Sequence, residues 1–527
     1  MSDALAMNTD VLIIGGGLAG AWAAIAAARE GAAVTLVDKG YFGTSGVTAT
    51  AGPGHWWSPP DPPEARRDAI AQRNARAFGL ADPQWMERII DLTWRTLPTL
   101  APYYRFSKDE HGVTQYRGLR GPEYLRALRC LASDLGVRIL DHSPAVELLA
   151  SRDGTVVGAN GFQRQARRRW TIRAGGVVLA TGGCAFRSHL LGSDNNTGDG
   201  LLMGVEAGAE LSGMEFSSYY TVAPACSTMT RSMSYAFARY FDADGQPLQI
   251  AQGPDATRAL AAALLAGPVL CSLDQTPEEV RRVMPQVQPN FMLPFDRWGV
   301  DPYSQKFEIT LRGEGTVRGV GGLRIADEDC GVGVRGLFAA GDVASRELVA
   351  GATSGGGAQN SAWALSSGHW AGAAAARFSR RLPNRVQEGM AQGRAGIRPL
   401  KRENRLDLVG AQTAVKAEML PYDKNVFRSG VKLSRSLEVL EDLWRNVCDN
   451  AGGPGADLVR SRETAALVAA GRWCYTAALA RNESRGMHQR TDAPLTDPRL
   501  GRRLRLRGLD HILFHPETNR RAAEASA

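Results

Sequence analysis

The sequence is poor in the residue patterns that build metal clusters and disulfide frameworks. Its 527 residues include seven cysteines, and no two of them lie within three residues of each other. The closely spaced cysteine pairs of zinc ribbons and iron–sulfur sites are therefore excluded, and the odd count gives no disulfide framework. We expect no bound metal, and a reducing, cytoplasmic compartment suits free thiols.

Residues 11–28 form an apolar, uncharged run at the lower limit of transmembrane length. Asp3 and Asp10 precede it without any Lys or Arg, so the basic region of a signal peptide is missing. The glycines in its middle would suit a lipid-facing helix poorly. We expect a buried strand followed by a buried helix, and no membrane span.

The excess of positive charge is small. The sequence has 62 Lys and Arg residues and 54 Asp and Glu residues, which gives a net charge of +8. The arginine-rich stretches lack the interleaved aromatic residues that stack on bases, so we expect no nucleic-acid partner. Residues 499–507 hold five arginines. We interpret them as a solvated face, and a docking surface for an acidic electron carrier is the alternative.

Glycine, in contrast, is abundant. It makes up 59 of the 527 residues, or about 11%, whereas its ordinary share is about 7%. Such an excess hints at a large cofactor, because glycine allows close backbone approach to a ligand. The first glycine-rich motif has the order strand (10–14), GGGLAG (15–20), alanine-rich helix (22–29), strand (33–37) and Asp38. This order is typical of a dinucleotide-binding βαβ unit.

The glycines of such a unit have separate tasks. Gly15 allows the tight turn, Gly17 lets the backbone approach a pyrophosphate, and Gly20 lets helix and strand pack closely. Asp38 can accept hydrogen bonds from ribose hydroxyls. The small, polar residues 39–52 follow directly and could line a phosphate and a flavin ring, which favours FAD over NAD.

Three further segments are VVLATGG with NTGDG and MEF (residues 177–216), GLFAAGD with a glycine run and NS (336–361), and ESRGMH (483–488). With residues 15–52, they resemble, in family order, the FAD-dependent flavoprotein superfamily of succinate dehydrogenase, fumarate reductase, L-aspartate oxidase and adenylylsulfate reductase α subunits. The resemblance implies an α/β fold with a Rossmann-like FAD-binding domain, an inserted α+β capping domain and a C-terminal helical domain. The implied boundaries are 1–216 and 313–383 for the two parts of the FAD-binding domain, 217–312 for the cap and 384–527 for the helical domain.

The motifs and the resemblance together assign a set of residues to FAD binding. Asp199 could instead cap the helix that it begins. The assigned residues are Gly15, Gly17, Leu18, Ala19, Gly20, Asp38, Lys39, Thr44, Ser45, Thr48, Ala49, Gly52, Val146, Ala180, Thr181, Gly182, Asn196, Thr197, Asp199, Gly341, Asp342, Asn360 and Ser361.

The sequence departs from the family where the chemistry differs between members. Gly46 stands where succinate dehydrogenases carry the histidine that bonds to the flavin, so the resemblance implies non-covalent FAD. Val317 stands at the histidine position of the dicarboxylate enzymes, and residues 351–361 lack their arginine. Because guanidinium groups grip carboxylates, fumarate, succinate and aspartate are disfavoured as substrates. Arg318 is either a replacement cation or a surface residue.

Candidate catalytic residues come mainly from the cap and its edges. Arg258 has the family spacing of the cap arginine that delivers a proton, although a solvated helix arginine would look the same. Glu215 and Tyr219 are expected to face the cleft between flavin and cap, and weaker candidates are Tyr220 and His189.

Arg485 and His488 belong to the ESRGMH segment. In the family this segment packs the helical domain on the flavin domain, and its arginine and histidine lie towards the active site in some members. We prefer the structural role and keep both as catalytic candidates. His55 is interpreted as an ordinary loop histidine.

The function that these observations favour is an FAD-dependent oxidoreductase. A hydride would move between a small-molecule substrate and non-covalent FAD, and electrons would pass to a ferredoxin-like iron–sulfur partner. Two alternatives remain open: a flavin oxidase that uses oxygen, and a non-catalytic flavin scaffold in an electron-transfer complex. An oligomer is possible.

Overall fold

The computed structural model describes residues 4–109, 111–229, 232–250, 255–288, 290–382, 388–401 and 406–517. Its largest sheet has eight strands in the order β15-β4-β5-β6-β1-β2-β3, with β14 paired to β6. Strands β1, β2, β3, β6 and β14 run parallel, whereas β4, β5 and β15 join by antiparallel pairing. The strands are β1 (Leu5–Ile14), β2 (Val34–Val37), β3 (Arg138–Leu140), β4 (Ala145–Ala150), β5 (Val156–Gln163), β6 (Arg168–Leu179), β14 (Leu337–Ala339) and β15 (Met390–Ala391).

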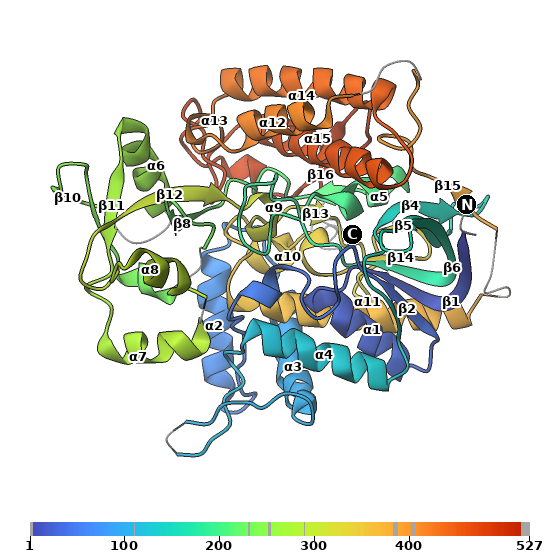
Figure 1. Ribbon diagram of the computed structural model, residues 1–527, viewed down its shortest axis with the longest axis horizontal. Helices are drawn as coiled ribbons and strands as arrows, with labels where there is room; N and C mark the ends of the chain where they lie inside the picture. The colour runs from blue at the N-terminus through green and yellow to red at the C-terminus, as the bar shows by residue number, and fades with distance from the viewer. Residues whose placement is uncertain are drawn as a thin grey trace.

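Helices α1 (Leu18–Arg29) and α11 (Ala358–Arg380) pack against each other and against this sheet. A Cβ added to Gly368 or Gly372 would overlap backbone atoms of α1, so the helices touch through glycine. Residues 11–14 are buried, as the strand expected at the start of the apolar run requires. In Figure 1, the helices α3 (Pro83–Thr96) and α4 (Gly121–Asp134) lie below them, and α2 (Pro63–Ala75) stands to their left.

A second, antiparallel sheet lies at the left of Figure 1, in the order β10-β9-β11-β12-β8. Buried residues of its strands and of the helices between them form a separate apolar core. The elements are β8 (Tyr220–Pro224), β9 (Arg239–Phe241), β10 (Pro247–Leu248), α6 (Ala256–Ala266), β11 (Val269–Ser272), α7 (Glu278–Val287), α8 (Leu293–Trp298) and β12 (Phe307–Gly313).

The C-terminal part places helices across the top of Figure 1. It also supplies two strands of a third sheet, in the order β13-β7-β16-β17, so that three distant parts of the chain are joined. These elements are β7 (Leu211–Ser212), β13 (Gly322–Leu323), α12 (Leu408–Met419), α13 (Tyr422–Asn425), α14 (Gly430–Asn450), α15 (Ala456–Ala480), β16 (Leu504–Arg507) and β17 (Leu513–Pro516).

The remaining helices are short. They are η1 (Val47–Thr50), η2 (Leu97–Leu100), α5 (Asp199–Glu206), η3 (Met233–Phe237), α9 (Gly315–Arg318), η4 (Gly341–Val343), α10 (Glu347–Ala350) and η5 (Pro498–Leu500). Within the described ranges, no helix combines the length and apolarity needed to cross a bilayer.

Candidate functional site

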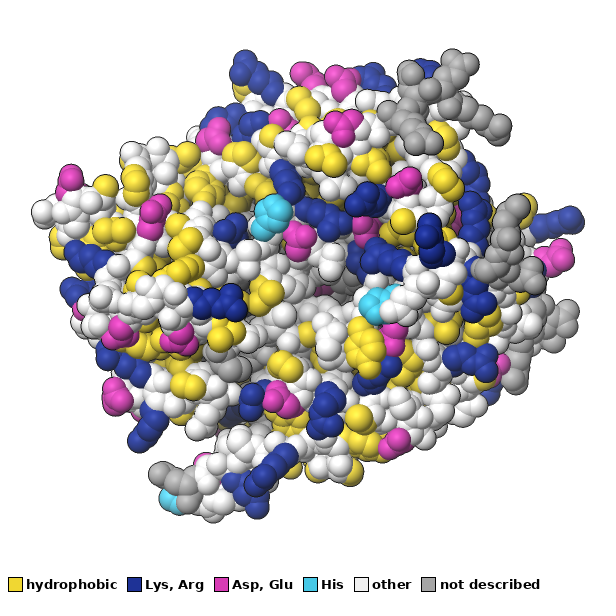
Figure 2. All heavy atoms as spheres, viewed as in Figure 1, with side chains coloured by type: hydrophobic (Ala, Val, Ile, Leu, Met, Phe, Trp, Pro, Cys, Tyr) yellow, Lys and Arg dark blue, Asp and Glu magenta, His cyan; other side chains and the backbone are white. Residues whose placement is uncertain are grey.

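A cavity of about 460 Å³ lies at the carboxyl ends of β1, β2, β6 and β14. In doubly wound sheets, ligands bind at this edge. Figure 2 shows that this face of the molecule is hollowed near its middle, with Lys, Arg and His side chains around the hollow. The predicted cofactor residues that line the cavity are Gly15, Gly17, Leu18, Ala19, Asp38, Lys39, Thr44, Ser45, Thr48, Ala180, Thr181, Gly182, Asn196, Asp199, Gly341, Asp342, Asn360 and Ser361.

The glycine turn between β1 and α1 forms the base of the cavity. Gly15 has a φ of +109°, and a Cβ there would overlap the carbonyl of Ala180. A Cβ at Gly20 would overlap the carbonyl of Gly15, whereas a Cβ at Gly17 would meet no atom within 4 Å. Gly15 and Gly20 are therefore needed for packing, and Gly17 leaves open space at the amino end of α1. That space and the N–H groups of the helix end fit a pyrophosphate.

Asp38 is buried and fixes the loop that follows it. Its Oδ2 accepts a hydrogen bond from Gly16 N at 2.6 Å, and its Oδ1 accepts from Gly40 N at 2.7 Å and from the Ser45 hydroxyl. One carboxylate thus ties the glycine turn to the loop of residues 40–45. A carboxylate at this place can accept hydrogen bonds from a ribose diol. The open space at Gly17 and the carboxylate of Asp38 therefore both suit a bound FAD.

Lys39 and Asp199 form an ion pair at the cavity wall. Lys39 Nζ lies 2.8 Å from Asp199 Oδ2 and also donates to Thr197 Oγ1 and Glu463 Oε1. Burial alone would raise the pKa of Asp199, but Lys39 and its hydrogen bonds hold that pKa below the usual value. Gly198 occupies the N-cap of α5, and the Asp199 side chain lines the cavity. The geometry therefore favours the contact role over the capping role.

Five predicted cofactor residues lie outside the lining: Gly20, Ala49, Gly52, Val146 and Thr197. Gly20 packs α1 on the turn, and Thr197 positions Lys39. Conversely, sequence reasoning missed several lining residues on other elements. No local motif marks them, because the fold alone brings them to the cavity. The missed residues include His142, Pro144, Arg164, Gly192, Asp194, Asn195 and Met203.

Tyr219, which directly precedes β8, and Arg318, at the end of α9, form a pair. Arg318 Nη1 donates to the Tyr219 hydroxyl at 3.2 Å, and the guanidinium carbon lies 5.4 Å from the centre of the tyrosine ring. Glu314 lies 3.8 Å from Arg318 Nε. Burial alone would lower the pKa of Arg318, but Tyr219, Glu314 and Asp342 hold it above the usual value. Arg318 is thus charged and acts electrostatically on Asp342, which lines the cavity.

The contact found for Arg258 involves neither Tyr219 nor Arg318. It is on α6, and its guanidinium carbon lies 5.2 Å from the centre of the Phe427 ring. The two weaker candidates, Tyr220 and His189, also interact with groups outside the cavity. Tyr220 donates to the carbonyl of Leu420, and His189 is exposed and lies 3.2 Å from Lys416 Nζ.

Arg346 is a fully buried cation that no sequence argument singled out. Its Nη1 donates to Asp342 Oδ1 at 2.8 Å, Asn360 Oδ1 at 2.8 Å and Val317 O at 2.9 Å. Burial lowers its pKa and Asp342 opposes that effect. Because Asp342 and Asn360 both line the cavity, this one side chain fixes two predicted FAD-binding residues from different elements.

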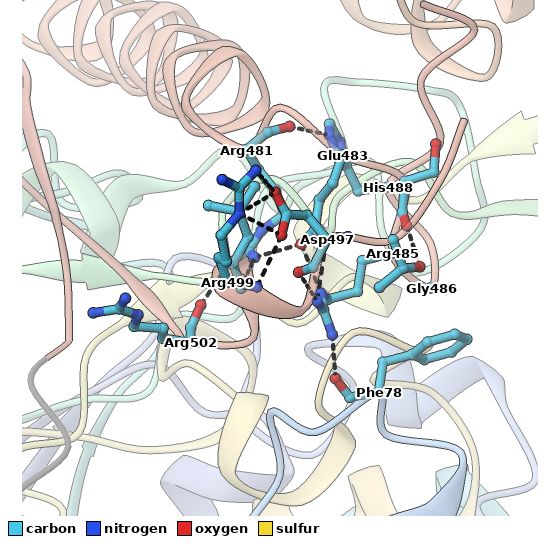
Figure 3. Close-up of polar contacts among 12 residues, drawn as sticks. Phe78, Arg481, Glu483, Arg485, Gly486, His488, Asp497, Arg499 and Arg502 are labelled. Carbon is cyan, nitrogen blue, oxygen red and sulfur yellow. Dashed lines mark hydrogen bonds and ion pairs between the residues drawn. The ribbon is translucent and has the colours of Figure 1, made fainter. Parts of the chain in front are cut away.

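Glu215 and Arg485 belong to a buried network of ion pairs, part of which Figure 3 shows. Arg481 Nε lies 2.6 Å from Glu215 Oε1, and Arg481 Nη1 lies 3.0 Å from Glu483 Oε1. Glu483 also holds Arg485 Nε at 2.6 Å, and Arg485 donates to the carbonyl of Phe78. Glu215 therefore points into this network and is absent from the cavity lining. Its contacts, and those of Arg485, favour a structural role.

His488 is buried beside the same network. Its Nε2 lies 3.0 Å from the carbonyl of Arg481, and its Nδ1 lies 2.9 Å from Arg428 Nη1. Burial and the neighbouring Arg428 lower its pKa well below the usual value. A neutral ring satisfies both contacts, with Nε2–H donating and Nδ1 accepting. This arrangement also favours the structural role.

Carboxylates compensate several cations of the arginine-rich stretch 499–507. Arg503 Nε lies 2.6 Å from Glu517, Arg499 Nη2 lies 2.8 Å from Asp497, and Arg505 pairs with Glu210. These pairs favour the interpretation as a solvated face over a docking surface for an acidic electron carrier.

The fold and this site define an FAD-dependent oxidoreductase. The sequence matches three families: FAD dependent oxidoreductase over residues 10–119, FAD binding domain over residues 92–359, and Fumarate reductase flavoprotein C-term over residues 417–513. The chain belongs to the succinate dehydrogenase/fumarate reductase flavoprotein family, which confirms the predicted family, fold class and FAD cofactor.

Full-length relatives agree with this assignment. One subunit of the fumarate reductase (CoM/CoB) of Methanothermobacter marburgensis is 27% identical over 93% of this chain and 95% of its own length. L-aspartate oxidase of Caulobacter vibrioides is 29% identical over 92% of this chain and 94% of its own length.

Solved structures share the fold. The Mycobacterium smegmatis Sdh1 complex has a chain with a TM-score of 0.80 and 21% identity, matched over 98% of this chain and 94% of that one. Adenylylsulfate reductase from Archaeoglobus fulgidus gives a TM-score of 0.77 and 18% identity, over 97% of this chain and 96% of that one.

Proposed function

We propose that this flavoprotein moves a hydride between a small-molecule substrate and non-covalently bound FAD, and that it exchanges electrons with a ferredoxin-like iron–sulfur partner. The observation that carries the proposal is that three separate glycine-rich stretches meet at one cavity, with residues 15, 17–19, 180–182 and 340–342 in its wall. When bound there, FAD supplies the two-electron chemistry, and the protein supplies binding, orientation and electrostatics.

Each group of residues has a task in this proposal. The turn around Gly17 binds the pyrophosphate, and Asp38 orients the ribose. Asp342 and Asn360, fixed by Arg346, hold the cofactor at the opposite wall. The Tyr219–Arg318 pair lies between this wall and the cap, where it can orient a substrate; Arg258 is the proposed proton donor of the cap.

Non-covalent binding rests on Gly46. This residue lines the cavity with a φ of +78° and has no side chain that could bond to the flavin. The same reasoning disfavours a dicarboxylate substrate, since Val317 is a buried apolar residue and the loop of residues 351–361 carries no arginine of its own.

Two observations bear on the electron acceptor. The M. marburgensis relative is named as one subunit of an enzyme, and the M. smegmatis structure is that of a complex, which supports a partner chain. The C. vibrioides relative is named as an oxidase, which supports oxygen as the second candidate.

The test is anaerobic reduction of the purified, flavin-loaded protein with dithionite, followed by mixing with either a ferredoxin or dissolved oxygen. We expect rapid reoxidation by the ferredoxin and slow reoxidation by oxygen. Rapid reoxidation by oxygen with one peroxide per flavin would favour the oxidase. A flavin that dithionite cannot reduce, or that neither acceptor reoxidises, would favour the non-catalytic scaffold and contradict both proposals.

A further inference from the structure

Aromatic side chains form a continuous series from the cavity wall to the surface. Its inner members, Trp22 and Tyr124, are fully buried, and Trp22 Nε1 donates a hydrogen bond to the Tyr124 hydroxyl at 2.9 Å. Trp22 lies on α1, one helical turn from Leu18, which lines the cavity. Tyr124 lies on α4, one turn from Gly121, where a Cβ would overlap the carbonyl of the cavity residue Thr48. The series therefore begins one helical turn from the cavity wall.

The series continues outward through close ring contacts. Successive ring centres lie 6.1, 4.9, 4.6, 4.6 and 4.2 Å apart along Tyr124, Tyr104, Phe106, Tyr116, Trp57 and Trp94. Spacings of this size are direct contacts between neighbouring rings. Tyr116, Trp57 and Trp94 are partly exposed, so the series ends at the surface. We call these residues, with Trp22, the tyrosine chain.

His55 gives Tyr124 an acceptor for its phenol proton. The Tyr124 oxygen lies 3.4 Å from His55 Nε2, and Trp22 already donates to the same oxygen, so the phenol hydrogen points to the histidine. His55 Nδ1 is buried without a hydrogen-bond partner in the described residues, and burial lowers the pKa of His55 to about 3. The ring is therefore neutral. Because an oxidised tyrosine is a strong acid, even this weak base takes up its proton.

A second series, the tryptophan chain, also starts at the cavity but differs in charge. Trp363 Nε1 donates to the carbonyl of the cavity residue Gly341 at 3.1 Å. The ring of Trp85 lies 5.8 Å from that of Trp363 and 5.7 Å from that of Trp370. Arg88 stacks on both outer rings, with its guanidinium carbon 4.4 and 4.3 Å from their centres. A positive charge opposes the loss of an electron from a neighbouring ring, so this chain is blocked.

The tyrosine chain is free of such a charge. Within the described ranges, no Lys or Arg is found stacked on any of its rings. Tyrosine and tryptophan are the aromatic side chains that lose an electron most readily, and Phe106 alone in the chain is a ring that resists oxidation. It fills the gap between two tyrosines as a packed bridge.

We propose that the tyrosine chain carries single electrons from the surface to the cofactor cavity, so that a thiol in solution reduces the bound flavin under light. Tyr124 gives one electron to the light-excited oxidised flavin and its phenol proton to His55. Electrons then pass inward along the chain, Tyr124 recovers its electron and proton, and the oxidised tryptophan at the surface takes an electron from a thiol. Two such transfers deliver two electrons and two protons to one flavin and join two thiols in one disulfide.

The experiment illuminates the flavin-loaded protein with blue light under argon in the presence of glutathione. The loss of visible flavin absorption is measured per bound flavin. We expect photoreduction that is slowed at least fivefold in Tyr124→Phe and in Trp57→Phe, because phenylalanine keeps an aromatic ring but resists oxidation. Trp85→Phe makes the same change to a partly exposed tryptophan of the blocked chain. It is the matched control and should keep the rate of the unmodified protein.

The inference goes beyond the proposed function, because it needs bound FAD but neither a substrate nor a partner protein. Absence of photoreduction, or equal rates in the unmodified protein, Tyr124→Phe and Trp57→Phe, would overturn it. A Trp85→Phe variant as slow as Trp57→Phe would overturn it too, because any tryptophan would then serve. If Trp57→Phe loses its flavin, Trp94→Phe at the partly exposed end carries the same prediction. A protein that takes up no FAD at all would instead contradict the cofactor site.

Discussion

Glu347 gives the sharpest stability prediction, because its carboxyl group is buried next to another carboxylate. It follows Arg346 directly, is 1% exposed, and its Oε2 accepts a hydrogen bond from Ser212. Its Oε1 has no hydrogen-bond partner in the described residues, and neither has Oε2 of Glu215. Burial first and the charge of Glu215 second raise the pKa of Glu347 to about 8 from its ordinary value of 4.5.

The sign and size of the effect follow from this pKa. Below pH 4.5 the group is protonated in both folded and unfolded chains and costs nothing. Between pH 4.5 and about 8 only the folded chain holds the proton, so folded-state stability falls as the pH rises and levels off above about pH 8. At about 1.4 kcal/mol per pH unit, the full interval corresponds to about 5 kcal/mol.

The substitution Glu347→Gln keeps the volume of the side chain and replaces the carboxyl group with an amide that does not titrate. Urea denaturation, followed by tryptophan fluorescence from pH 5 to 9, should show a variant that gains stability relative to the unmodified protein as the pH rises. Across this pH range the gain should be about 4 kcal/mol, and it should stop increasing above about pH 8. Glu438→Gln, an exposed carboxyl on α14, is the matched control and should follow the unmodified protein. Parallel curves for Glu347→Gln and the unmodified protein, at any constant offset, would refute the reasoning.

Three further predictions follow from named contacts. Gly372→Ala places a Cβ against the backbone of Ala23 where α1 and α11 touch, so overpacking should cost about 1–3 kcal/mol and lower the melting temperature; an unchanged melting temperature would contradict the packing. Glu215→Ala leaves Arg481 with Glu483 as its remaining carboxylate partner but leaves its buried Nε without an acceptor, so it should cost about 1–3 kcal/mol in urea denaturation, whereas an unchanged free energy of unfolding would show that the buried pair is dispensable. Arg346→Gln should weaken FAD binding at least tenfold in a fluorescence titration, since it releases two cavity residues, and unchanged affinity would remove it from the cofactor site.

The parts of the site that could be predicted are those in which local backbone geometry and ligand contact coincide. The turn at residues 15–20 requires glycine for its own packing and also forms the cavity base, so sequence motif and site agree. The same holds for residues 180–182 and 341–342, which directly follow buried strands. The family and the cofactor were predictable because these short motifs occur in order along the chain.

The remaining parts depend on contacts between segments far apart in the sequence. His142 and Arg164 reach the cavity from ordinary turns around β4 and β5, and no local pattern distinguishes them from surface residues. Glu215 was expected to face the cleft because its segment does so by resemblance. Its direction is set instead by Arg481, which lies 266 positions later in the chain. Such pairings follow from tertiary packing and leave no periodic signal.

The central claim, one FAD held without a covalent bond in this cavity, is tested most directly by acid precipitation of the flavin-loaded protein. We expect one flavin per chain, all of it in the supernatant, with a colourless and non-fluorescent pellet. We also expect that Gly17→Leu, which fills the open space at the base of the cavity, abolishes flavin uptake while the chain remains folded. Yellow, fluorescent protein in the pellet would contradict non-covalent binding, and full flavin loading of the Gly17→Leu variant would contradict the place of the cofactor.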